Sequence, residues 1–493
     1  MRWVFSLSST LLFCFILSCA DHKVEDAKVT QVSGNVLTSI GNRVITVNDY
    51  IKRCEYVPRP NYCKNNNYIH KKIALNSLIA EKLLALEFEK KKLNFTNAQK
   101  NLITGRKEQS MRQLMLKING FDKVKLDSEV VDIIAKQSKR TYEVSFLILN
   151  AIQNKQVSRE RITSLINIQD RIPDLPAVST KLITLNDEMP EEVKNILFFL
   201  KPAKNFLYGP IALSKTKHMF FEVSSWNTLV SVTDEQKKQA HIDAEKTYRE
   251  STALKIYKKY ISTLMSQKEL VFDPEVFQVF SDKISDVYLI EKEKKESVIQ
   301  NTIWNEETKI VDDISSFNDL KMIRNERLLT FDNEKFSVRN VLNLIKKHPL
   351  VFRNRNVSSK SFSNELKYAL ADLFRDREIT DQAYRLDYDK EKDIVNIENK
   401  WKDFISSSIM KDVLTNGLSD KEAFIKLSSK IDSLQKLHSS IIKIDTDKFE
   451  QIKLTSIDMN VIYTNQAYPL IEPSFPILTD DHVLDYGKKH NFN

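Results

Sequence analysis

Apolar residues recur every three or four positions along several long stretches of the chain, and this spacing predicts amphipathic helices. One stretch runs from about His70 to Lys92, a second from about Asn97 to Ile118, and a third from Thr233 to about Gln267. A shorter helix is predicted to begin at Asp127, where Asp-Ser-Glu supplies the side-chain oxygen and the acidic group that favour a helix N-terminus. The pattern therefore predicts a mainly helical chain.

Two β-type patterns interrupt these helices. Residues 36–48 read as a short hairpin with a Gly41-Asn42 turn, after which Thr46 is placed to cap a helix. A longer run of β-prone residues extends from Tyr142 to Leu149. Strands are therefore expected both at the start of the chain and after its first helices.

The segment from Met189 to Trp226 predicts a helix, a turn and two strands in close succession. Pro190 and the two glutamates after it suit a helix start, because the missing N–H of proline is not needed there and acidic groups favour unpaired N–H donors. Gly209-Pro210 predicts a turn, and the run after His218 is β-prone. These features predict a small α+β unit.

The N-terminus carries a targeting pattern. Arg2 precedes an apolar run that ends in Ile-Leu-Ser-Cys at Cys19, and this run is too short for a comfortable membrane span of about 20 residues. Ile-Leu-Ser-Cys resembles a bacterial lipobox, which implies lipidation of Cys19. An ordinary secretory signal or an N-terminal anchor helix are the alternatives. Residues 20–35 then suit a flexible tether.

Only two cysteines remain in the mature chain, Cys54 and Cys63. Two prolines lie between them, and a bend there would bring the thiols together in a disulfide worth roughly 2–3 kcal/mol. The alternative is two free thiols. No CxxC or HxxxH spacing occurs, so no metal site is predicted.

Composition excludes several functions. The 493 residues include seven glycines, with no GxxxxGK[ST], GxGxxG or GxSxG motif, so neither a nucleotide nor another cofactor is expected. The net charge of +9 is spread along the chain and is not clustered with aromatic residues. Nucleic acid is therefore not an expected partner.

The Met189–Trp226 segment resembles the second half of a parvulin-type peptidyl-prolyl isomerase domain. The match lies in Leu200-Lys201-Pro202, Gly209-Pro210-Ile211, His218 and Val223. The preceding chain resembles the N-terminal chaperone domain of SurA-like and PrsA-like periplasmic folding factors. That second likeness lies in Gly41 to Tyr50, Leu78 to Lys90 and Tyr142 to Leu149.

The resemblance implies an α+β fold that is mostly α, with helical SurA-N-like lobes and an inserted parvulin-like α/β domain. The helix after Thr233 would return to the N-terminal helices, with a coiled coil to another chain as the alternative. Phe336–Leu342 repeats the pattern of Ile45–Ile51, which indicates either a second helical copy or a generic helical pattern. The tail after Gln466, with its prolines, is predicted to be extended and to lie on a neighbouring surface.

The expected parts are a lipoprotein signal peptide (1–19), a tether (20–35), a helical chaperone domain (36–141), a degenerate parvulin-like domain (142–228), a return helix (233–270), a connecting region (271–325), a second helical copy (326–420), and a C-terminal helix with the tail (421–493).

A parvulin site has two histidines, a cysteine or aspartate, and an apolar pocket. By the resemblance, Phe146 stands where the first histidine is expected, while His218 remains as a candidate remnant of the second. No cysteine follows Cys63, so isomerase activity is expected to be lost. The basin could still bind an extended apolar peptide, although the same side chains could instead fill the core. The candidate peptide-binding residues are Phe146, Phe198, Phe199, Tyr208, His218, Met219 and Phe220.

Together with the targeting pattern, the resemblance implies an ATP-independent folding chaperone of the bacterial cell envelope. It would be exported, lipid-anchored through Cys19 in the inner or outer membrane, and would bind unfolded outer-membrane or secreted polypeptides. The alternatives are an active peptidyl-prolyl isomerase and a structural lipoprotein subunit of an envelope complex.

Overall fold

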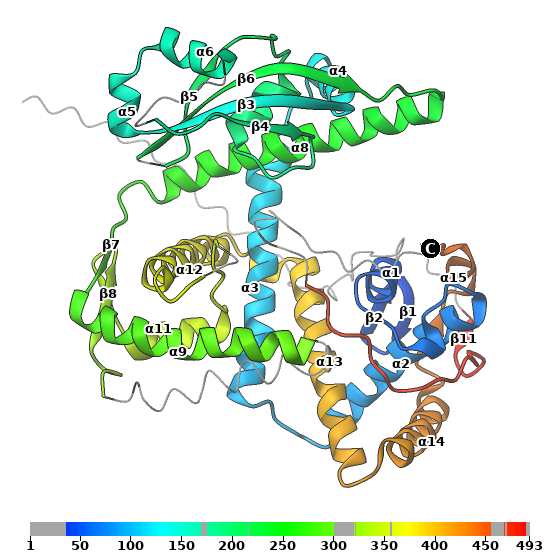
Figure 1. The fold of residues 1–493 in the computed structure, drawn as a ribbon. Coiled ribbons are helices and arrows are strands. Elements are labelled where there is room, and N and C mark those ends of the chain that lie inside the picture. The colour runs from blue at the N-terminus through cyan, green and yellow to red at the C-terminus, as the bar shows by residue number, and fades with distance from the viewer. Residues whose placement is uncertain are drawn as a thin grey trace, which may run out of the picture. The chain divides into compact units, whose positions relative to one another are not determined.

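The structure, a computed structural model, describes residues 36–168, 175–214, 216–299, 320, 322–354, 357–454, 468 and 471–489 (Figure 1). This described part is mostly helical, with 58% helix and three small sheets, which confirms the predicted α+β, mainly α class. The predicted signal peptide, Cys19 and the tether lie outside the described residues. Within the described part, no helix has both the length and the apolar character needed to cross a bilayer.

The chain forms two compact units, each built from separate parts of the sequence. The first lobe contains the described residues of 36–91, 406–454 and 472–489. The second lobe contains those between 92 and 405, with Tyr468 and Ile471. The predicted domains follow the order of the chain, whereas both lobes combine distant segments.

The first lobe has one four-stranded sheet of order β11-β10-β1-β2. The pairs β1–β2 and β1–β10 are antiparallel, and β11 lies parallel to β10. Helix α2 packs against α14 and the hairpin. The elements are β1 (Val36–Ile40), β2 (Arg43–Thr46), α1 (Val47–Glu55), the 3₁₀ turn η1 (Asn61–Cys63), α2 (Tyr68–Lys90), α14 (Asp420–His438), β10 (Ile442–Ile444), α15 (Thr446–Gln451) and β11 (Lys488–Lys489). Helix α13 (Lys392–Thr415) contributes residues to both lobes.

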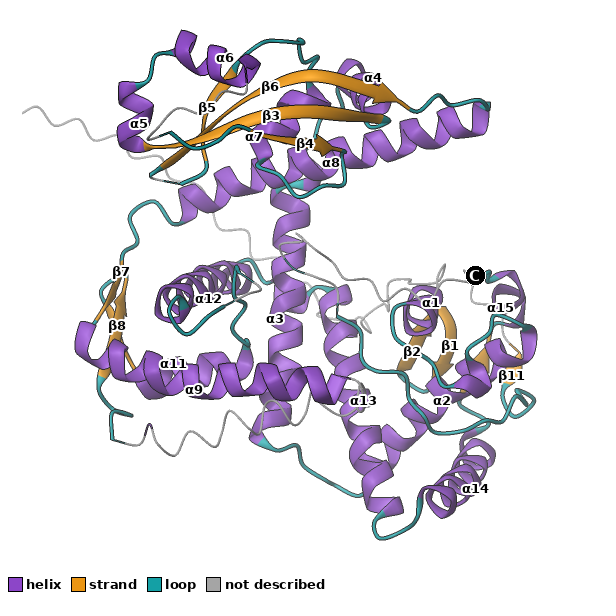
Figure 2. Cartoon of the chain, in the orientation of Figure 1, coloured by secondary structure: helices purple, strands orange, loops and turns teal. Residues whose placement is uncertain are grey.

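The second lobe packs long helices beside a three-stranded sheet of order β7-β8-β9. Helix α3 contacts α11, α12 and α8 (Figure 2). The elements are α3 (Asn97–Asn119), η2 (Phe121–Lys123), α8 (Asp234–Leu264), β7 (Leu270–Phe272), α9 (Pro274–Ile299), β8 (Arg327–Phe331), β9 (Glu334–Ser337), α11 (Val338–Lys347), α12 (Phe362–Arg385) and η6 (Tyr388–Lys390).

A small mixed domain, called here the inserted domain, lies in the chain between η2 and α8. Its antiparallel sheet has the order β4-β3-β6-β5, and its helix α4 packs on α8. The elements are α4 (Ser128–Gln137), β3 (Arg140–Asn150), α5 (Ala151–Gln156), α6 (Arg159–Ile168), β4 (Ser179–Ile183), α7 (Glu191–Lys194), the π-helical turn η3 (Asn195–Phe199), β5 (Tyr208–Ala212) and β6 (Lys217–Thr228).

The same series of elements occurs twice along the chain. A hairpin, a short helix and two long helices form β1, β2, α1, α2 and α3, and the series recurs as β8, β9, α11, α12 and α13. Both hairpins turn through residues with positive φ, at Gly41 in one and at Asp332 and Asn333 in the other. Thr46 and Ser337 each close a capping box at the start of the next helix. Helix α2 has 23 residues and α12 has 24.

Each hairpin takes its third strand from a distant part of the chain. Strand β10 pairs with β1, placing Thr38 opposite Ile444, while β7 pairs with β8, placing Leu270 opposite Phe331. Each lobe therefore joins a hairpin and two helices of one repeat to the later helices and third strand of the other. Neither half of the sequence contains a whole lobe.

Candidate functional site

The register between β3 and β6 determines which predicted site residues share a face of the inserted sheet. Phe146 lies opposite Phe221, Ile148 opposite Met219, and Leu149 opposite His218. Side chains alternate between the two faces along a strand, and directly paired residues share a face. Phe146 and His218 therefore lie on opposite faces.

The face that carries Phe146 is covered by α4, α7, η3 and α8. Phe198 is fully buried there, with its ring 5.4 Å from that of Tyr142 in an edge-to-face contact. Phe199 and Met219 are also buried, and Phe146 and Tyr208 pack partly buried against the same cluster. Most of the predicted peptide-binding aromatics on this face are therefore core residues.

The other face carries His218 and Phe220. Phe220 is buried with Leu147 against α6, so it too is a core residue. His218 is only partly buried, and its ring Nδ1 has no hydrogen-bond partner among the described residues. The predicted basin therefore does not assemble around His218, because its members are divided between the two faces.

Exposed apolar side chains occur instead in the loop that leads into β5. Leu200 and Phe206 are each about half exposed, at 51% and 52%. The ring of Phe206 contacts that of Tyr208 at 4.9 Å, and Tyr208 stacks on the buried Phe221 at 5.1 Å. The backbone carbonyl of Leu200 accepts a hydrogen bond from Gln137, which holds the start of this loop against α4.

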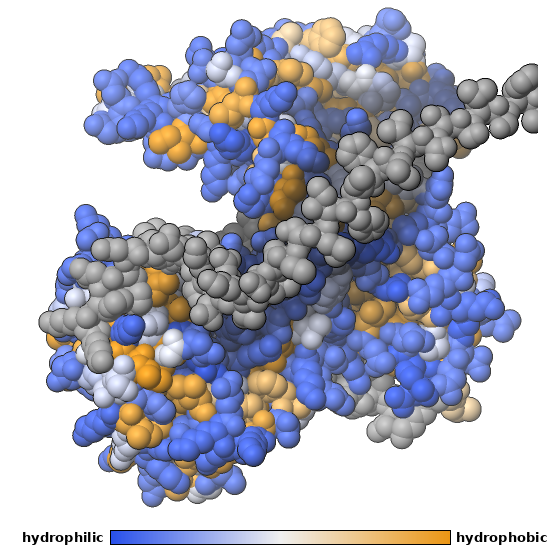
Figure 3. Space-filling view, turned by 180° about the vertical axis from the view of Figure 1, so that it is seen from behind, coloured by the Kyte–Doolittle hydropathy of each residue, from blue (hydrophilic) through white to orange (hydrophobic). Residues whose placement is uncertain are grey.

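The segment between β6 and α8 is more exposed still. Leu229, Val230 and Val232 have exposed fractions of 76%, 82% and 83%. Lys139 holds this segment through its backbone carbonyl, which accepts from the amide of Leu229 at 3.0 Å. Figure 3 shows hydrophobic side chains reaching the surface of the inserted domain. Sequence analysis did not select these residues, although an apolar Leu-Val-Ser-Val run directly before a capped helix is a readable signal.

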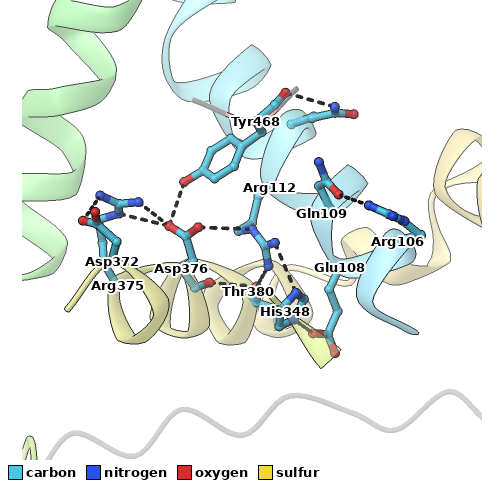
Figure 4. Close-up of polar contacts among 11 residues, drawn as sticks. Arg106, Glu108, Gln109, Arg112, His348, Asp372, Arg375, Asp376, Thr380 and Tyr468 are labelled. Carbon is cyan, nitrogen blue, oxygen red and sulfur yellow. Dashed lines mark hydrogen bonds and ion pairs between the residues drawn. The ribbon is translucent and has the colours of Figure 1, made fainter. Parts of the chain in front are cut away.

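A second group of polar side chains lies where α3, α11 and α12 meet in the second lobe (Figure 4). Glu108 receives hydrogen bonds from Lys347 Nζ at 2.9 Å and Tyr384 Oη at 3.2 Å, and its Oε2 lies 2.6 Å from His348 Nε2. Burial alone would raise the pKa of Glu108, but His348 and Lys347 hold it at about 2. Burial lowers the pKa of His348 below its usual value, despite the neighbouring carboxylate.

Close backbone approach brings this group together. A Cβ built on Gly105 of α3 would lie 2.2 Å from the backbone carbonyl oxygen of Lys347. Only glycine leaves room for that carbonyl, and the approach places Lys347 and His348 beside Glu108, one helical turn after Gly105.

The group continues along α12 to the C-terminal segment. Arg112 donates to Thr380 Oγ1 at 2.8 Å, and its Nε lies 3.9 Å from Asp376. The hydroxyl of Tyr468 donates to Asp376 at 3.4 Å, and Gln113 donates to the backbone carbonyl of Tyr468 at 3.1 Å. Each of these side chains has a hydrogen-bond or ion-pair partner within the chain. The group contains no cysteine or serine nucleophile. Its geometry suits a polar link between helices of the two repeats.

The two mature-chain cysteines lie in the first lobe. Both Cys54 and Cys63 are buried and are free thiols in the structure, so the predicted disulfide is not formed there and stays a prediction for the oxidised protein. Burial raises the pKa of Cys54 to about 11 and that of Cys63 to about 12. Such thiols are weak nucleophiles near neutral pH.

No cluster of His, Cys, Asp and Glu suited to a metal ion occurs in the part of the chain that the structure describes. No protein-family model, curated protein or solved structure matches the chain.

Proposed function

We propose that the protein is an ATP-independent folding chaperone of the bacterial cell envelope, anchored by lipid at Cys19. Its clients would be unfolded outer-membrane or secreted polypeptides. The targeting pattern at the N-terminus and the resemblance to SurA-like folding factors supply the expected location and family. The observation that carries the proposal is the exposed apolar segment from Leu229 to Val232.

Exposed apolar side chains favour binding to other apolar surfaces, because burial stabilises by roughly 25 cal/mol per Å². Leu229, Val230 and Val232 lie in a segment without helix or strand, so their side chains can adapt to different partners. Leu200 and Phe206 add apolar surface to the same inserted domain. Binding of this kind requires apolar residues in the client but no particular sequence, which suits a chaperone with varied clients.

The arrangement of the inserted domain favours binding over catalysis. An isomerase must place polar groups around the rotating amide beside a pocket for the proline ring. Here Phe146 and His218 lie on opposite sheet faces, and Phe198, Met219 and Phe220 are buried. We therefore propose that the domain binds or spaces clients and does not catalyse isomerisation.

The test is aggregation of an outer-membrane protein diluted from urea, followed by light scattering without ATP. We expect the full mature protein to suppress aggregation at near-stoichiometric amounts. The variant L229S/V230S/V232S should need several-fold more protein for the same suppression. The matched control is V351S, which removes a 76% exposed apolar side chain outside the inserted domain and should leave suppression unchanged.

Absence of suppression at several-fold molar excess would overturn the proposal. Recovery of a single stoichiometric membrane partner from cells, without a broad set of clients, would instead favour a structural subunit. Acceleration of prolyl isomerisation that H218A abolishes would favour an active isomerase.

A further inference from the structure

Residues 472–489 are extended, and the first part of this segment, 472–479, lies mostly buried against the rest of the first lobe, as its prolines predict. Residues 472–485 form neither helix nor strand, and β11 then adds two residues to the sheet beside β10. Phe475 and Leu478 are buried, at 4% and 2% exposed, whereas Ile477 between them is 38% exposed. The segment 472–489, called here the tail, thus buries selected apolar side chains as a bound peptide does.

Side chains of α1 and α2 hold this tail by its backbone. Arg53 Nη2 donates to the carbonyl of Ser474 at 2.7 Å, and Ser77 Oγ donates to that of Thr479 at 3.2 Å. Asn76 Nδ2 donates to the carbonyl of Asp481 at 2.8 Å. Every polypeptide offers such carbonyls, so these three donors require an extended backbone and no particular sequence.

A buried ion pair fixes one of these donors. Arg53 of α1 and Glu81 of α2 are 2% and 1% exposed, and Nη2 of Arg53 lies 2.7 Å from the Glu81 carboxylate. The same nitrogen bonds the Ser474 carbonyl. An ion pair this deeply buried costs desolvation that its own attraction offsets only in part. Its orientation toward a tail carbonyl gives the pair a role in binding the backbone.

We propose that the surface formed by α1 and α2 is a polypeptide-binding groove of the first lobe, which the tail occupies as a built-in competitor. The external partner is an extended segment of unfolded polypeptide with apolar or proline residues at the spacing of Pro473, Phe475 and Leu478. This inference deepens the proposed chaperone function by naming a client site. A covalently attached tail competes at a high effective concentration, so the groove opens only to clients that bind at several points.

The test uses a fluorescent peptide of residues 471–489 and the full mature protein. In the variant F475D/L478D, charges replace the two buried anchors and should release the tail. We expect this variant to bind the peptide at least tenfold more tightly than the wild type. The control I477D places the same charge at the exposed position and should bind the peptide as the wild type does. A folded F475D/L478D variant, judged by circular dichroism, that binds no better than the wild type would overturn the inference.

A second measurement uses the unchanged protein, in case that variant does not fold. Excess unlabelled peptide should displace the resident tail and speed amide hydrogen exchange over residues 472–486. Unchanged exchange at saturating peptide would overturn the inference. Peptide binding without suppression of client aggregation would support the groove while refuting the chaperone function. Suppression of aggregation without peptide binding would support the chaperone function while refuting the groove.

Discussion

The imidazole Nε2 of His348, directly after α11, lies 2.6 Å from Oε2 of Glu108 on α3, and joins helices from the two repeats. Both groups are largely buried, with side chains 14% and 5% exposed. Arg112, Lys347 and Tyr384 also contact the pair, and Asp381 of α12 interacts electrostatically with Glu108. The protonation of these two side chains should therefore influence the stability of the second lobe.

Acidification should destabilise the second lobe in two steps. The pKa of His348 is lowered from 6.5, so the unfolded chain takes up a proton near that pH that folded His348 does not accept. The pKa of Glu108 is lowered from 4.5 to about 2, so its stabilisation is present above about pH 4.5 and is lost as the pH falls toward 2. This change of about 2.5 pKa units, at about 1.4 kcal/mol per unit, sets an upper bound of roughly 3–4 kcal/mol on the Glu108 contribution.

The substitution E108Q tests this interpretation. We expect a loss of about 2 kcal/mol at pH 7, because Lys347 and His348 lose their carboxylate, and a smaller loss at pH 3. Urea unfolding at both pH values measures the difference. The control D122N removes an exposed carboxylate that bonds Lys117 and should change stability little at either pH. An equal loss from E108Q at pH 7 and pH 3 would contradict the assigned ionisation.

The change in stability caused by G105A has opposite signs for helix propensity and for close helix packing, so this substitution distinguishes the two effects. A glycine inside a helix ordinarily costs stability, so alanine there should stabilise by roughly 0.5–1 kcal/mol. The close approach of the Lys347 carbonyl predicts the opposite, because a Cβ at 2.2 Å would push α11 away from α3. We expect G105A to lower the unfolding free energy by about 2 kcal/mol or more, as overpacking does elsewhere. A stabilised G105A protein would show that the helices do not approach this closely.

The exchanged strands predict how the chain behaves when it is divided between the repeats. Residues 20–306 contain β1 and β7, and residues 307–493 contain β8 and β10, so each piece lacks the strand that completes its own hairpin sheet. We expect the two pieces to co-purify as a one-to-one complex when expressed together, and to be largely insoluble when expressed apart. Size-exclusion chromatography with light scattering measures the complex. Two separately folded, non-associating pieces would contradict the exchange.

Local signals in the sequence predicted the elements but not their partners. The helix expected from about His70 to Lys92 is α2, and the Thr46 cap and the hairpin before it are both confirmed. These features depend on residues close in sequence. Strands β7 and β10 have three residues each, too few for a readable alternation, and the residues they pair with lie 57 to 406 positions away in the sequence. The sequence therefore could not show which segments of the chain combine to form each lobe.

The arrangement of the candidate site could not be predicted either, because it also depends on how distant segments pair. The sequence predicted β3 and the run after His218 as strands, and the alternation within each strand was readable. The faces of Phe146 and His218 relative to one another depend on the register between the strands, which includes an irregularity between Glu143 and Val144. One residue of slip exchanges the two faces, and no local signal fixes it.

The opposite placement of Phe146 and His218 yields a last test. If the loss of one histidine were the only defect of an otherwise parvulin-like site, F146H should restore isomerase activity. The register predicts that it does not, because the new imidazole would face the Phe221 cluster and not His218. We expect prolyl isomerisation of a short peptide to proceed at the buffer rate with the wild type, F146H and H218A alike. The F146H protein should also be less stable by about 1–3 kcal/mol, since a polar ring enters a partly buried apolar site. Acceleration by F146H that H218A abolishes would mean that the two side chains share a face.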